Sequence, residues 1–217
     1  MPGLEALPET IRALRPVQTL ERSLREGRVA HAIMLAGDDL PLLGQVAEGL
    51  AATLLGTGLN VDKHPDFFTL RPAKKSRAIL VGKRHDTEPN TVRSLIRDLN
   101  QTANQGGHKV AVVHEVDRMN ATAANAFLKT LEEPPRQTVI LLLTTRPYDV
   151  METIRSRCFQ FKIPSGLQRD TGESWNRWLD DYRAWIRLLH SDPDQARRQA
   201  GRSILEAYGL LSRLVDE

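Results

Sequence analysis

Two hydrophobic patterns alternate along residues 1–164 of the chain. Continuous apolar runs at 31–37, 110–113 and 138–145 are typical of strands buried on both faces. Shorter strands are predicted at 66–72 and 159–164. Because helical patterns separate these runs, the sequence predicts an α/β layered fold with a mostly parallel central sheet.

The helical segments carry apolar residues at spacings of three and four, which place them on one helix face. Residues 9–26 show this spacing, and Pro16 predicts a helix that starts near it, because proline is tolerated in a first turn. Three further helices are bounded by capping or stopping residues: Gly56 ends one, Asn90 or Thr91 starts the next, and Asn120 and Pro134 bound the third. The polar, basic segment 72–89 predicts a loop, or a hairpin around 78–81.

The pattern changes after Pro164, where a linker-like stretch leads into wholly helical sequence. Tryptophans mark the first of two predicted helices, and Asp192–Pro193 starts the second. We therefore expect an α/β domain at 1–164 and a short helical domain at 165–217.

The composition is that of an ordinary globular protein, with 41% hydrophobic and 26% charged residues among 217. No apolar run approaches the roughly 20 residues of a membrane span, so we expect a cytoplasmic protein without a membrane partner. The single cysteine, Cys158, cannot form an internal disulfide or a multi-cysteine zinc site. A net charge of +3 and a pI of about 9.2 fit a mild attraction to polyanions.

The segment after the first predicted strand has the layout of a phosphate-binding loop without its lysine. In a G-x-x-x-x-G-K-[ST] loop, backbone N–H groups surround the phosphates, the lysine neutralises their charge and the hydroxyl holds magnesium. Counted from Gly37, this chain has Leu43 at the lysine position and Gly44 at the hydroxyl position, while Asp38 and Asp39 add negative charge. We expect a βα turn capped by one of the two aspartates, and no nucleotide cofactor.

A second polar cluster follows the strand at 110–113. Glu115 and Asp117 could in principle hold magnesium, as carboxylates do at this place in ATPases. Since the loop opposite lacks its lysine and hydroxyl, we expect pairing with Lys109, Arg118 or helix termini instead. His114 has no second histidine at ligand spacing, and no metal is predicted.

Three segments carry a family resemblance: GGHKVAVVHEVDRMNATAANAFLKTLEEPP, TVILLLTT and TIRSRCFQF. Together with HAIMLAG and HPDFFTLRP they resemble the clamp-loader branch of the AAA+ family, and most closely the delta-prime subunits of bacterial DNA polymerase III, over residues 15–163. The resemblance implies an AAA+ fold and a role in DNA replication. It also implies assembly with gamma/tau-type motor subunits and a delta-type subunit, with primer-template DNA and a sliding clamp met through that complex.

The resemblance also implies a functional arginine. In clamp loaders ATP lies between subunits, and the arginine of a Ser-Arg-Cys motif reaches into the neighbour's site. Here that motif is Ser156, Arg157 and Cys158, which makes Arg157 the expected arginine finger, whereas Arg155 lacks the motif context. A guanidinium supplied in trans stabilises charge on a transferred γ-phosphoryl group. Delta-prime subunits often cannot hydrolyse ATP themselves, so no ATPase activity is expected of this chain alone.

The chain departs from the family pattern in two places. The family commonly has a four-cysteine zinc module before its His-Pro-Asp segment, but no cysteine lies near His64, so zinc is excluded. The family also continues into a helical collar, whereas this sequence stops at Glu217 with space only for a short helical domain, so we expect either a fragment or an assembly that is weaker or different. Thr144 and Thr145 occupy the place of the family's polar sensor, and we expect a structural role for them.

Three other functions stay open. An active ATPase is disfavoured by the missing lysine. A DNA-binding module could use the basic residues between Arg71 and Arg84, although that run lacks aromatic residues for base stacking. A diverged clamp-loader-like protein outside replication is the third.

Overall fold

The computed structural model describes residues 2–72, 77–82, 89–101, 103, 107–165, 178 and 180–186. The chain divides into two compact units, Met1–Ser165 and Gly166–Glu217. In the second unit residues 180–186 are helical, and the ring of Tyr182 stacks on that of Trp178 with 5.4 Å between centroids. The helix predicted to start at Asp192–Pro193 lies outside the described residues.

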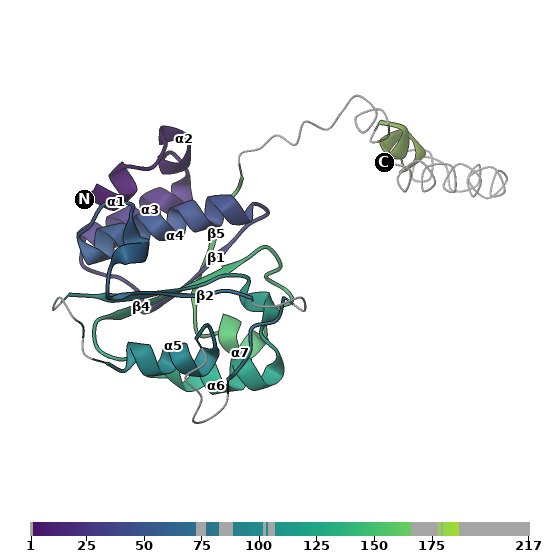
Figure 1. The fold of residues 1–217 in the computed structure, drawn as a ribbon. Helices are drawn as coiled ribbons and strands as arrows, with labels where there is room; N and C mark the ends of the chain where they lie inside the picture. The colour runs from purple at the N-terminus through teal and green to yellow at the C-terminus, as the bar shows by residue number, and fades with distance from the viewer. Residues whose placement is uncertain are drawn as a thin grey trace. The chain divides into compact units, whose positions relative to one another are not determined.

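A five-stranded parallel sheet forms the centre of the first unit (Figure 1). Its order is β2-β3-β4-β1-β5. The strands are β1 (Ala32–Ala36), β2 (Phe67–Leu70), β3 (Lys109–Val113), β4 (Thr138–Thr144) and β5 (Phe159–Lys162). The predicted α/β fold with a parallel central sheet is therefore confirmed.

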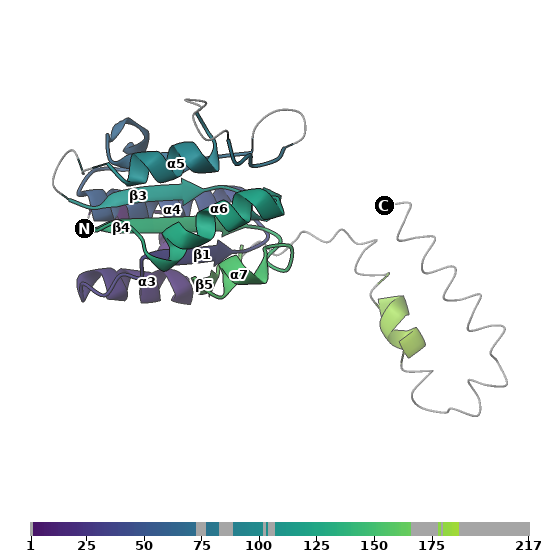
Figure 2. The same ribbon diagram turned by 90° about the horizontal axis from the view of Figure 1, so that it is seen from below.

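Helices cover both faces of this sheet (Figures 1 and 2). One face carries α1 (Pro2–Glu5), α2 (Glu9–Arg12), α3 (Arg15–Arg25) and α4 (Leu40–Leu55). The other carries α5 (Val92–Leu99), α6 (Ala121–Glu132) and α7 (Glu152–Arg155). Alternate strand residues enter two separate cores: Ile33 and Leu35 of β1 join the first, and Ala32 and Met34 join the second. Burial on both faces explains why the central strands are continuously apolar.

Local signals set the helix ends much as the sequence predicts. Pro16 lies in the first turn of α3, although the separate helix α2 precedes it. Thr91, and not Asn90, caps α5 in a reciprocal capping box with Ser94. The Asn120 side chain accepts a hydrogen bond from the Ala123 N–H at 2.9 Å and starts α6.

Only residues 77–82 of the central basic loop are described, so the hairpin expected around 78–81 lies partly outside the described residues. Ile79 makes an isolated parallel bridge to Met119, and its N–H donates to the Arg118 carbonyl at 3.1 Å. These two contacts fix the segment beside the end of the short 3-10 helix that follows β3. Among the described residues, no helix is both long enough and apolar enough to cross a membrane.

Candidate functional site

The candidate residues lie at two opposite ends of the parallel sheet. Gly37, Glu115 and Thr144 lie at the carboxyl end, where β1, β3 and β4 finish. Arg157 lies near the amino end, because Phe159 opens β5 and pairs with Ile33 near the start of β1. Ligands of open α/β sheets usually bind at the carboxyl end.

The glycine of the incomplete phosphate loop is used for packing. A Cβ atom on Gly37 would lie 2.5 Å from the carbonyl oxygen of Ile163, just after β5. The Gly37 N–H donates to the Thr144 carbonyl at 3.2 Å. Position 37 therefore needs a glycine, because the chain after β1 passes close to the backbone after β5. The Gly37 N–H is hydrogen-bonded within the fold, to Thr144.

Asp39 closes the amino terminus of α4. Its carboxylate accepts a hydrogen bond from the Leu42 N–H at 3.1 Å, and its carbonyl accepts one from the Leu43 N–H at 3.0 Å. This negative charge complements the helix dipole where a bound phosphate would do so. Leu43, at the lysine position, is fully buried in the core. The prediction of a βα turn capped by an aspartate is confirmed, and the capping residue is Asp39.

Arginines pair with the two carboxylates that follow β3. Arg77 contacts Glu115 at 2.5 Å, and Arg118 lies 3.6 Å from Glu115 and 3.9 Å from Asp117. The hydrogen bond from Arg77 is the main reason that the pKa of Glu115 lies below its ordinary value. Asp117 also accepts a hydrogen bond from the buried hydroxyl of Thr144 at 2.6 Å. The chain's own cations thus occupy the position at which a metal would neutralise this pair.

Of the partners predicted for these carboxylates, Arg118 is confirmed, whereas Lys109 pairs elsewhere. Lys109 is the first residue of β3, so it lies at the amino end of the sheet, a strand length away from Glu115. Its buried ammonium donates to the carbonyls of Leu99, the last residue of α5, and of Gln101 just beyond it. Burial lowers the pKa of Lys109, and the charge of Asp66 opposes that shift.

His114 lies beside the acidic pair but adds little charge to it. Only 8% of its surface is exposed, and burial lowers its pKa to about 4, with the Arg71 charge acting in the same direction. The imidazole is therefore neutral at pH 7. In the described part of the chain, no three His, Cys, Asp or Glu side chains gather as a metal site would require.

Arg157 is anchored at the amino end while part of it remains accessible. Its Nε donates to Glu132 at 2.8 Å, and Nη2 lies 2.5 Å from the same carboxylate oxygen. Its Nη1 donates to the Thr153 carbonyl at 2.8 Å and lies 3.3 Å from the Ser156 hydroxyl. The side chain is 34% exposed. These contacts hold the guanidinium in one place without burying it.

The neighbours of Arg157 have structural contacts. The Cys158 thiol donates to the Ile154 carbonyl at 3.2 Å, and burial raises its pKa to about 12, so it stays protonated. Arg155 turns elsewhere, donating to the Pro147 carbonyl and lying 6.0 Å from the Tyr148 ring centroid. Sequence reasoning missed Glu132; the only signal was its place at the end of the helix in TLEEPP.

The basic run considered as a DNA-binding patch is only partly described. Arg77 forms an ion pair with Glu115. The side-chain amide of Asn90 accepts a hydrogen bond from the Arg71 N–H and donates one to the Arg71 carbonyl, both at 2.8 Å. Lys74, Lys75, Lys83 and Arg84 lie outside the described residues.

The sheet order and the two helical layers define an AAA+ type fold. A Thermotoga maritima protein described as DNA polymerase III gamma subunit-related has a similar crystal structure, with a TM-score of 0.56 and 26% identity. The similarity covers 76% of this chain and 53% of that one. This confirms the predicted fold family.

A family model described as DNA polymerase III, delta subunit matches residues 14–166. The chain therefore belongs to this family of DNA replication proteins, and the predicted kinship with delta-prime subunits of the clamp loader is confirmed. The delta' subunit of Pseudomonas aeruginosa is 40% identical over 121 residues, and that of Escherichia coli K12 is 35% identical over 161 residues. The matches cover 56% and 67% of this chain but only 33% and 46% of the relatives, so the chain spans less than half of their length.

Proposed function

We propose that this chain is a non-catalytic clamp-loader subunit that supplies Arg157 in trans to the ATP site of a motor subunit. The observation that carries this proposal is the anchored, partly exposed guanidinium of Arg157 within the Ser-Arg-Cys motif. Its partners are gamma/tau-type motor subunits and a delta-type subunit. Primer-template DNA and the sliding clamp are reached through the assembled complex, in the cytoplasm.

The position of Arg157 suits a head-to-tail contact between different surfaces of two subunits. A motor subunit of the same fold would hold ATP at the carboxyl end of its sheet, whereas Arg157 lies near the amino end of this one. Glu132 and the Thr153 carbonyl limit the rotamers of Arg157, so less conformational entropy is lost when it meets a phosphate. An arginine supplied in this way raises NTP hydrolysis by about 10³ to 10⁵ in other enzymes.

The chain's own loop supports a subunit without ATPase activity. Leu43 is buried where a lysine is required, and Asp39 places negative charge at the start of α4. Arg77 and Arg118 compete with any metal for Glu115. The loop is therefore a degenerate Walker A sequence, kept for its packing, and the chain takes neither a nucleotide cofactor nor a metal.

Reconstitution with the motor and delta-type subunits of the same cell tests the proposal. We expect DNA-stimulated ATP turnover with the wild-type chain, a clear loss with Arg157→Ala, and no turnover by the chain alone. Arg155→Ala is the control, because Arg155 faces Pro147 and Tyr148. Size-exclusion chromatography establishes that each mixture has assembled. Equal turnover with Arg157→Ala and wild type, in fully assembled complexes, would remove the finger assignment.

A further inference from the structure

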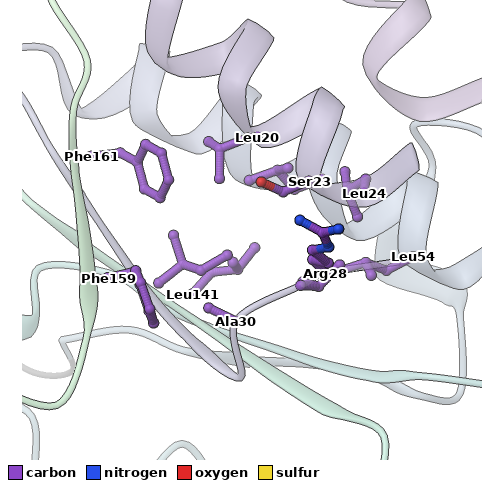
Figure 3. A pocket seen from close by; sticks show the side chains of 12 residues that line it. Leu20, Ser23, Leu24, Arg28, Ala30, Leu54, Leu141, Phe159 and Phe161 are labelled. Atoms are coloured by element: carbon purple, nitrogen blue, oxygen red, sulfur yellow. The ribbon is translucent and has the colours of Figure 1, made fainter. Parts of the chain in front are cut away.

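A cavity of about 360 Å³ opens between α3, α4 and the edge strand β5 (Figure 3). Its walls are mostly apolar and include Leu20, Leu24, Leu141 and Phe161. Phe159 lines it as well, yet 66% of the Phe159 surface is exposed. A large exposed aromatic residue beside an apolar cavity is typical of a binding surface.

A second cleft, of about 490 Å³, adjoins the first. The two share Leu24, Val29 and Leu54, and the second extends to residues 134–139 before and within the start of β4. The two adjoining cavities lie near the amino end of the sheet and are together called here the amino-end groove. Its lining runs from Phe159 and Phe161 of β5 to residues 134–138 after α6.

The charges along the amino-end groove have one sign. The charged side chains are Arg28, which lines the first cavity, and Arg136, which lines the second; His31 and His108 also line the second. No Asp or Glu occurs among the described residues that line either one. Glu26 lies outside the lining, 3.6 Å from Arg28, whose side chain is 81% exposed. Figure 3 shows the Arg28 guanidinium on the side of the cavity where Ser23 and Leu24 lie.

We propose that the amino-end groove binds a segment of a partner protein that combines apolar anchor residues with acidic residues. The anchors would enter the cavity between Leu20, Leu141 and Phe161, and the carboxylates would face Arg28 and Arg136. Charge complementarity of this kind gives an interface its specificity. In the described part of the sheet β5 pairs only with β1, so its outer side can accept an extended segment. This role uses none of the contacts of Arg157 and goes beyond the proposed function.

Fluorescence anisotropy of three labelled synthetic peptides with the full chain tests this proposal. The first peptide alternates leucine and glutamate, the second leucine and lysine, and the third serine and glutamate. We expect only the first to bind, and the double charge reversal Arg28→Glu, Arg136→Glu to weaken its Kd by about tenfold or more. Arg15→Glu, at the other end of α3 and outside both linings, is the matched control and keeps wild-type binding.

Three results of the binding experiment would overturn the proposal. Binding of the leucine and lysine peptide as tightly as the acidic one would remove the charge argument, and no binding of any peptide would remove the site. Saturation by dodecanoate without peptide binding would assign the cavity to a small amphiphile instead.

Far-UV circular dichroism checks that the protein with both charge reversals, at the exposed Arg28 and Arg136, is still folded. Arg157→Ala should bind the acidic peptide as wild type does, which separates this site from the finger.

Discussion

The carboxyl and amino ends of the sheet differ in what their polar groups do. At the carboxyl end, Asp39 caps its own helix, Arg77 pairs with Glu115, and Thr144 donates to Asp117. At the amino end, Arg157 is held by backbone and carboxylate oxygens but stays partly exposed. Both ends carry an arginine paired with a carboxylate of the chain, but Glu115 is only 15% exposed whereas Glu132 is 48% exposed, so solvent reaches the carboxylate of the Arg157 pair more freely than that of the Arg77 pair. The difference indicates that the two ends of one sheet can cover or expose the same kind of ion pair.

Restoring the missing lysine should be the most damaging change. Leu43→Lys places an ammonium in a fully buried position, and we expect a loss of more than about 3 kcal/mol in the free energy of unfolding. Urea denaturation measures it, and Leu43→Met, expected to cost less than about 1.5 kcal/mol, is the control. A folded Leu43→Lys protein that binds ATP would show that the carboxyl end is an open site after all.

The two glycines of the loop should respond in opposite directions. Gly37→Ala brings a Cβ to 2.5 Å from the Ile163 carbonyl and should cost about 1–3 kcal/mol. Gly44 lies within α4 with open space around it, so Gly44→Ala should stabilise the protein by about 0.5–1 kcal/mol. Thermal denaturation of both variants checks this, and a neutral Gly37→Ala would contradict the packing role.

Removing the charge that holds Arg157 should have a smaller effect than removing Arg157. In the reconstituted complex Glu132→Gln keeps an acceptor but loses the ion pair, and we expect turnover to fall roughly tenfold through poorer positioning. Glu133→Gln, on the next residue, is the matched control. Wild-type turnover with Glu132→Gln would mean that Glu132 does not position the finger.

The smallest expected effect concerns pH. The folded-state pKa of Glu115 lies below the ordinary value of 4.5, so its contribution to stability is present above that pH and is lost as the pH falls through the folded pKa. Arg77→Ala removes the main cause of this shift and should therefore lower stability slightly at pH 7 and by less at pH 3. Urea denaturation at both pH values, with exposed Arg15→Ala as control, gives the comparison. A loss of equal size at pH 3 would point to packing instead of charge.

Short-range patterns predicted much of this molecule. The apolar runs around Met34, Val112 and Leu141 are the central strands, and the caps at Thr91 and Asn120 start the helices expected of them. Each of these signals acts within a few residues, through strand burial or a hydrogen bond to the first helical turn. Side-chain contacts between distant segments were not predicted: Arg77 pairs with Glu115 and Arg157 with Glu132 without any local signal for either pair.

By itself, the sequence determined the layered fold, the family, and the loss of the lysine and hydroxyl from the loop after β1. Only the tertiary structure decided that Gly37 serves the close approach to Ile163, that Arg77 neutralises Glu115, and that Glu132 holds Arg157. The last two pairs join residues 38 and 25 positions apart. Such contacts depend on how β-strands and helices are brought together, because a charged side chain takes whichever partner the packed core places beside it.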